Sequence, residues 1–202
     1  MKTTGVVIVN YNTPNIITRA VESVRMHVDR VLIIDNSDHT NDAYKECDRL
    51  AMGNVDVYHT YCNLGHGLGL NRGIDLIGTD YVICMDSDAE LIDPTLLPEM
   101  RAILTNEKNY GCGLVVTTNE NGINSDKGID YLHPYFCMFK RSVFNMYSPF
   151  INHGAPFIRT MIEIQNKLEV FGVYEITNRC KHEGRATRKV AGSNWLKGWD
   201  KI

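Results

Sequence analysis

The chain has 202 residues, of which 44% are hydrophobic, 22% charged and 9% aromatic, a composition typical of one globular domain with a core of its own. The net charge of −3 is too small to indicate a nucleic-acid-binding or membrane protein, and the longest apolar runs are only strand-sized, so we expect no segment to span a bilayer. No signal-peptide pattern follows Met1 and the six cysteines are widely spaced, so we expect a cytoplasmic protein with reduced, buried thiols.

The charge is unevenly distributed along the chain. Residues 179–202 hold seven lysines and arginines against two acidic residues, whereas the preceding 178 residues hold 14 basic and 22 acidic side chains. A basic end on an acidic body favours an anionic partner at that end. Trp195 and Trp199 lie in the same segment, four residues apart. Such a pair usually packs against its own domain, and the alternative is peripheral contact with a membrane surface or an acceptor.

The first half of the chain alternates regularly between strand and helix patterns. Strands are predicted over residues 5–10, 30–35, 54–60 and 80–85, and helices over 14–28, through Tyr44, Cys47 and Leu50, and from the glycine-rich residues 63–69 to about 77. Strands joined by helices of this length imply right-handed crossovers and a parallel sheet. Ligands of such sheets bind beyond the carboxyl ends of the strands.

The second half of the chain is less regular. The sequence predicts helices over 93–104 and about 156–170, strands over 110–117, 135–139 and 172–176, and a polar loop over 119–130. A loop of that length is often functional. We therefore expect a single α/β domain with a mainly parallel central sheet.

Two aspartates at the end of the fourth predicted strand carry the strongest chemical signal. Asp86 and Asp88 flank Ser87 directly after an apolar strand, so their carboxylates converge on one point. Oxygen ligands of this kind suit Mg²⁺ or Mn²⁺, which commonly bridge carboxylates to substrate phosphates. An isolated Asp-x-Asp is more often a solvated turn, but the strand before it and the parallel sheet favour a metal site.

A second polar group follows the first two predicted strands. Asn10, Tyr11 and Asn12 end the first strand, and Asp35 ends the second. Because neighbouring parallel strands end at the same edge, Asp35 is placed to hydrogen-bond a base or a ribose. The alternative for Asp35 is a helix or turn cap.

The glycine-rich segment 63–73 opens the third predicted helix. Its Gly-x-Gly-x-Gly pattern lets the backbone approach a ligand, and a helix N-terminus favours anions. The segment fits neither a P-loop nor a dinucleotide fingerprint, so the pattern alone is weak evidence for a ligand-binding site. We count Asn63, Gly65 and Asn71 as candidate ligand-binding residues, and Asn71 has the alternative of being an ordinary polar helix residue.

Four motifs stand in a fixed order: VIVNYN, IIDNSD, NLGHGLGLNRG and YVICMDSDAELIDP. In this order and spacing the sequence resembles family 2 glycosyltransferases of the GT-A fold, closely over residues 5–105 and more loosely to His182. The resemblance implies one Rossmann-like GT-A domain with helices on both faces of the sheet. It also implies a nucleotide-sugar-binding half over 1–105 and an acceptor-binding half over 106–202, which carries the basic tail.

The resemblance further implies a reaction and its residues. A sugar passes from a nucleotide-diphosphate-sugar donor, such as a UDP-sugar, to an acceptor hydroxyl with inversion, assisted by a divalent metal ion, Mn²⁺ or Mg²⁺. Asp86 and Asp88 match the metal-binding motif, and His182 matches a late histidine that completes metal or diphosphate binding. The positions that match nucleotide contacts are Asn10, Tyr11, Asn12 and Asp35.

The sequence departs from the family pattern at the general base. Relatives carry an acidic triplet at the start of the late helix, where this chain reads Asn-His-Gly-Ala-Pro over residues 152–156. An imidazole titrates near neutral pH, so we favour His153 as the base. The alternatives are Asp126 in the long loop, Glu163 on the late helix, or a retaining or inactive enzyme that needs no base.

Two other functions and several acceptors stay open at this point. A sugar-phosphate nucleotidyltransferase would be expected to show a glycine-rich loop with basic residues after the first strand, which this chain lacks. A non-catalytic nucleotide-sugar-binding protein fits the missing acidic triplet. Acceptor specificity is expected to lie in residues 119–135 and the tail, and the acceptors considered are a glycan, a lipid-linked saccharide and a nucleic-acid hydroxyl.

Overall fold

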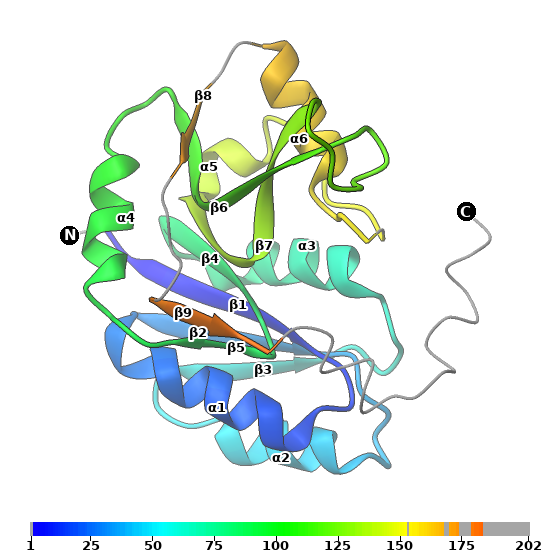
Figure 1. The fold of residues 1–202 in the computed structure, drawn as a ribbon. Coiled ribbons are helices and arrows are strands. Elements are labelled where there is room, and N and C mark those ends of the chain that lie inside the picture. The colour runs from blue at the N-terminus through cyan, green and yellow to red at the C-terminus, as the bar shows by residue number, and fades with distance from the viewer. Residues whose placement is uncertain (1, 153, 168–169, 174–178, 184–202) are drawn as a thin grey trace.

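The computed structural model describes residues 2–152, 154–167, 170–173 and 179–183. Within these residues, seven strands form one sheet in the order β3-β2-β1-β4-β7-β6-β8 (Figure 1). Its strands are β1 (Thr4–Asn10), β2 (Arg30–Asp35), β3 (Val55–His59), β4 (Tyr81–Asp86), β6 (Asn109–Thr118), β7 (Ile129–Lys140) and β8 (Val170–Val173). Two short strands, β5 (Ala89–Leu91) and β9 (Cys180–His182), pair antiparallel beside it.

Strands β1 to β4 are parallel, as the alternation of strands and helices predicted. Their register places Asn10 opposite Asp35 and Asp35 opposite His59. The polar residues at the ends of three strands therefore lie side by side at one edge of the sheet. Asp86 ends β4 at the same edge, opposite Val9 of β1.

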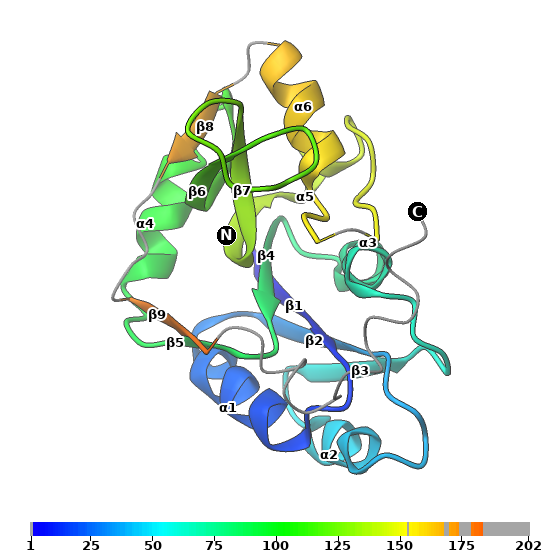
Figure 2. The ribbon, with the colours of Figure 1, turned by 45° about the vertical axis from the view of Figure 1, so that its right-hand side comes forward.

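Helices cover both faces of the sheet, as expected (Figure 2). One face packs against α1 (Pro14–Val24), α2 (Asp42–Leu50) and α4 (Leu96–Ile103), and the other against α3 (His66–Ile77), α5 (Arg141–Phe144) and α6 (Ile158–Asn166). Along β1, Val6 and Ile8 join the first core whereas Val7 joins the second, because successive side chains of a strand point to opposite faces. Strands buried on both faces read as continuous apolar runs.

The second half differs from the sequence prediction in its strands. The strand predicted over residues 135–139 is only the second part of β7, which is antiparallel to both β4 and β6. Tyr131 and Leu132 pair with Val116 and Val115, so the polar connection is the shorter loop 119–128 of a β-hairpin. His133 and Pro134 interrupt the apolar alternation there, which hides the strand from a periodicity argument.

Helix ends also differ from the prediction by several residues. Helix α1 gives way to the 3₁₀ turn η1 (Arg25–His27), and α6 ends at Asn166, whereas the sequence pattern extended it to about residue 170. Strand β8 covers Val170–Val173, and residues 174–176 of the predicted last strand lie outside the described residues, as does the tail with Trp195 and Trp199.

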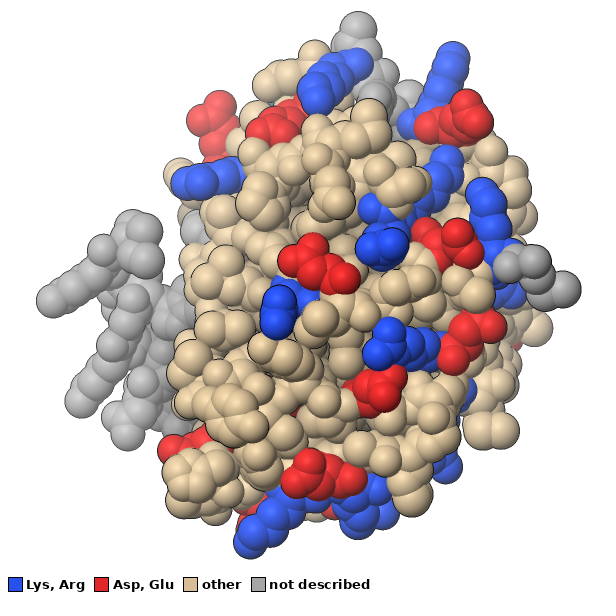
Figure 3. Space-filling view, turned by 180° about the vertical axis from the view of Figure 1, so that it is seen from behind, with Lys and Arg blue, Asp and Glu red and all other residues tan. Residues whose placement is uncertain are grey.

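The cysteines and the surface agree with the composition. All six thiols are free, and all except the exposed Cys62 are buried. On the face seen from behind, basic and acidic side chains of the described residues are interspersed (Figure 3). None of the described helices combines the length and apolar character that crossing a membrane requires.

Candidate functional site

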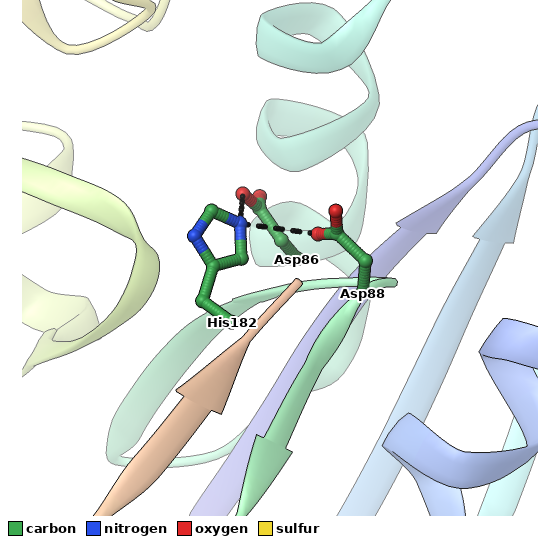
Figure 4. A group of neighbouring side chains, drawn as sticks. All are labelled: Asp86, Asp88 and His182. Carbon is green, nitrogen blue, oxygen red and sulfur yellow. Dashed lines mark ion pairs between the residues drawn. The ribbon is translucent and has the colours of Figure 1, made fainter. Parts of the chain in front are cut away.

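Two aspartates and a distant histidine meet beyond the end of β4. Asp86 is the last residue of β4, and the chain turns through Ser87 and Asp88 into β5. Ala89 of β5 pairs with His182 of β9, and this pairing brings the histidine to the turn. Its Nε2 lies 3.1 Å from Asp88 Oδ1 and 3.4 Å from Asp86 Oδ2 (Figure 4).

The three side chains fit a divalent cation. Each of Asp86, Asp88 and His182 offers one ligand atom, and these atoms lie within 4.8 Å of one another. Two carboxylate oxygens and one imidazole nitrogen are donors that suit Mn²⁺. Asp86 and His182 keep 21% and 29% of their side chains exposed, so an ion has access from solvent.

The electrostatics of the cluster depend on the histidine. Burial raises the pKa of Asp86, but hydrogen bonds from His182 and His66 outweigh it and lower that pKa far below its usual value. The same contact with Asp86, followed by that with Asp88, raises the pKa of His182 to about 10. At neutral pH an imidazolium therefore offsets one of the two carboxylate charges, and a cation that uses His182 as a ligand has to displace its proton.

Two further histidines lie beside the cluster and were missed in the sequence. His66 is the first residue of α3, and its Nε2 lies 3.2 Å from Asp86 Oδ1. His133 on β7 has its ring centroid 6.4 Å from that of His182, and burial lowers its pKa. Tyr135 stacks on His182 at 4.7 Å.

The sequence held a signal for only one of these two histidines. His66 stands inside the glycine-rich motif, whose pattern itself marks only the glycines and asparagines. His133 has no local signal, because only the antiparallel pairing of β7 with β4 brings residues 133–135 past the end of β4.

A second cluster forms where β1 and β2 end. The Nδ2 of Asn10 donates to Asp35 Oδ1 at 3.0 Å, and both side chains are fully buried. The backbone N–H of Asn12 donates to Ser37 Oγ at 2.9 Å. The buried Oδ1 of Asn12 has no hydrogen-bond partner within the described part of the chain. Tyr11, which lies between Asn10 and Asn12 in the sequence, is half-buried.

The glycine-rich segment packs against another part of the chain. A Cβ on Gly65 would lie 2.5 Å from Asn152 Oδ1, and one on Gly67 would lie 2.0 Å from the carbonyl oxygen of Ile151. Gly65 also has φ +81° as the N-cap of α3, and its N–H donates to Asn63 Oδ1. These glycines therefore make room for residues 151–152, a structural requirement that the motif alone did not indicate.

Asn71 uses its side chain to hold backbone. Its Nδ2 donates to the carbonyl oxygen of Phe150 at 2.8 Å, and its Oδ1 accepts from the N–H of the same residue at 3.0 Å. Both ends of the amide are thus engaged with the segment that precedes α6.

Comparison with known proteins identifies the family. Residues 5–163 match the model described as Glycosyl transferase family 2. The chain belongs to glycosyl transferase family 2. No curated protein is detectably similar to it in sequence.

Several solved structures share the fold of this family 2 chain. The mannosyltransferase PcManGT from Pyrobaculum calidifontis, solved with GDP-Man and Mn²⁺, has a TM-score of 0.67 at 16% identity, over 88% of this chain and 58% of its own. Glucosyl-3-phosphoglycerate synthase from Mycobacterium tuberculosis, solved with Mn²⁺, UDP-Glc and phosphoglyceric acid, has a TM-score of 0.67 at 16% identity, over 94% and 75%. S. aureus TarS 1-349 has a TM-score of 0.63 at 16% identity, over 86% and 58%. The chain thus spans 58% of the length of two of these structures.

The candidates for the general base of this family 2 chain differ in their surroundings. His153 lies outside the described residues. Its neighbour Asn152 is held at the start of α3, where its Nδ2 donates to the carbonyl oxygen of Leu64 at 2.6 Å. Glu163 accepts hydrogen bonds from the hydroxyl and the N–H of Ser148, which lower its pKa. Asp126 is exposed on the loop between β6 and β7.

Proposed function

We propose that this chain is a metal-dependent, inverting glycosyltransferase that moves a sugar from a nucleotide-diphosphate-sugar donor to an acceptor hydroxyl. The observation that carries the proposal is the convergence of Asp86, Asp88 and His182 at the carboxyl edge of a family 2 domain. The nucleotide cluster of Asn10 and Asp35 lies at the same edge. A donor that spans both clusters has its nucleoside at one and its diphosphate at the other.

Relatives of the same fold support the donor and the cofactor. PcManGT was solved with GDP-Man and Mn²⁺, and the mycobacterial synthase with UDP-Glc and Mn²⁺. We therefore infer a UDP-sugar or another nucleotide-diphosphate-sugar as donor and Mn²⁺ or Mg²⁺ as cofactor. Asp86, Asp88 and His182 would hold the ion, which when bound supplies positive charge that stabilises the departing diphosphate.

The chain's own groups have separate tasks in this proposal. Asp35 and Asn10 orient the nucleoside with Tyr11. The Oδ1 of Asn12, which has no partner among the described residues, accepts a hydrogen bond from the nucleoside. Helix α3 begins at His66, which contacts Asp86, so its N-terminal N–H groups border the site, where they favour the negative diphosphate. Asn63 and Gly65 shape that helix start, and Asn71 ties the helix to Phe150.

We infer that residues 1–105 bind the donor and that residues 106–202 bind the acceptor. An attacking hydroxyl needs a base within hydrogen-bond reach, and His153 is our proposed base. Acceptors of the proposed kind are a glycan, a lipid-linked saccharide or a nucleic-acid hydroxyl, and the cytoplasm stays the predicted location.

Release of nucleoside diphosphate tests the proposal. UDP-Glc, GDP-Man and other nucleotide-sugars are incubated with the chain in the presence of Mn²⁺ or of EDTA. The released nucleoside diphosphate is then measured. We expect release that requires the metal and is lost in Asp88→Ala, while the exposed Asp75→Asn on α3 behaves as the wild type. Binding of a nucleotide-sugar without turnover, with and without candidate acceptors, would instead support the non-catalytic relative.

A further inference from the structure

A line of hydrogen bonds lies behind Asp35, on the side away from β1. The Oδ2 of Asp35 is 2.9 Å from Nδ1 of His59 on β3, and the Nε2 of that histidine is 2.9 Å from Asp48 Oδ1 on α2. The other oxygen of Asp35, Oδ1, accepts from Asn10 Nδ2 at 3.0 Å and from the N–H of Ser37 at 3.2 Å. The line therefore joins the helix surface to the residues proposed to hold the nucleotide.

His59 is fixed in place by more than these two contacts. Its ring stacks on Tyr44 with the centroids 3.7 Å apart and the planes 16° from parallel. Only 13% of its side chain is exposed. The in-register pairing of β3 with β2 sets His59 opposite Asp35, so the strand, the stack and the two carboxylates all define one ring orientation.

Each ring nitrogen of His59 faces a carboxylate oxygen. The contacts engage both nitrogens of the ring, so the ring cannot rotate without losing a hydrogen bond. Asp35 is fully buried, and a buried carboxylate is costly unless it is paired and hydrogen-bonded. His59 provides that pairing at one oxygen, while Asn10 and Ser37 occupy the other.

We propose that His59 is a positioning residue for the donor nucleotide: it fixes the orientation of the Asp35 carboxylate, and through Asp35 it fixes the nucleotide-contacting side chains. This inference rests on the proposed function. The loops after β1 and β2 depend on the same carboxylate, because Ser37 both donates to Asp35 and accepts from the N–H of Asn12. Loss of His59 frees Asp35 to turn and releases both loops together.

The test compares nucleotide binding with metal binding. Calorimetry measures the Kd of UDP, GDP, ADP, CDP and dTDP with Mn²⁺, and the Kd of Mn²⁺ alone, for the wild type and for His59→Phe. Phenylalanine keeps the stacking on Tyr44 and removes both hydrogen bonds. We expect the tightest-binding diphosphate to bind about tenfold more weakly, as for a lost charge-assisted hydrogen bond, while the Kd of Mn²⁺ stays within about twofold. His59→Asn, which keeps one donor, is expected to recover part of the affinity.

A matched variant separates positioning from general stability. Val57→Ala shortens an apolar side chain two residues earlier on β3, on the same face as His59, and should lower stability without weakening nucleotide binding. Equal nucleotide affinity in folded His59→Phe and wild type would overturn the inference, as would parallel losses of nucleotide and Mn²⁺ affinity.

A surface variant covers the case in which His59→Phe does not fold. Asp48 keeps 60% of its side chain exposed, so Asp48→Ala is expected to fold. It removes one carboxylate from His59, and we expect nucleotide affinity to fall by about threefold; an unchanged affinity would overturn the inference. A wild type that binds none of the five diphosphates overturns the proposed function as well. If the wild type binds one of them, the variants test only the role of His59.

Discussion

Asp35 and Asp88 both lie at the carboxyl edge of the parallel strands, yet their surroundings differ. Asp35 is fully buried, and both of its oxygens are engaged by neighbouring strands and loops. The Asp88 cluster is open to solvent through Asp86 and His182 and is completed by the pairing of β5 with β9. The first cluster is an internal scaffold that orients its surroundings, whereas the second is accessible to the cation that we propose it binds.

The largest effect is expected for removal of the buried Asp35 carboxylate. Asp35→Ala removes the carboxylate that contacts His59 Nδ1, Asn10 Nδ2 and the N–H of Ser37, and breaking a buried pair costs about 3–5 kcal/mol of unfolding free energy. Urea denaturation followed by circular dichroism measures this loss. Asp56→Ala, which removes an exposed partner of Arg30, should cost about 1 kcal/mol or less. Equal costs for the two variants would contradict the scaffold role.

The open cluster should respond in function rather than in stability. Asp88→Asn removes a proposed metal ligand, and we expect Mn²⁺ affinity to fall by about 100-fold, since even partners of metal ligands are worth about 10–100-fold. Mn²⁺ titration monitored by electron paramagnetic resonance measures it. Asp75→Asn is the control. Unchanged Mn²⁺ affinity in a folded Asp88→Asn would place the ion elsewhere.

Metal binding should also depend on pH. Because its pKa is raised to about 10 without metal, His182 is protonated at pH 7 and must lose that proton to bind a cation. Mn²⁺ affinity should therefore rise by about tenfold per pH unit below that pKa, as one proton is released. Titrations between about pH 6.5 and 8.5 measure the slope. In His182→Ala the slope should disappear, and a wild-type affinity that does not change with pH would exclude His182 as a ligand.

The smallest expected effect concerns a partner of the cluster. His66 lies 3.2 Å from Asp86 through Nε2 and orients this carboxylate from the start of α3. His66→Ala should weaken Mn²⁺ binding by about tenfold, at the lower end of the effect of such partners. The exposed His27→Ala, on the turn before β2, is the matched control. An effect as large as that of Asp88→Asn would make His66 a ligand itself.

The sequence predicted the donor half of the fold well because its signals are local. Apolar runs such as Val31–Ile34 and the alternation with helices encode a parallel sheet with helices on both faces. Since parallel strands end at one edge, Asn10, Asp35 and Asp86 were expected to gather there, and they do. The acceptor half lacked such signals, and β7 was only half recognised.

Only the tertiary structure decided which distant residues complete each cluster. Pairing between strands far apart in the chain brings His182 to Asp88 and His133 past the end of β4. The register of β3 on β2 sets His59 behind Asp35, although nothing around His59 in the sequence marks it. The physical reason is that period and turn residues fix where a strand begins and ends. The partner and register of a strand depend on packing across the whole domain. The sequence therefore determined that the polar residues lie at the carboxyl edge of the parallel strands, and the tertiary structure determined which histidines contact them.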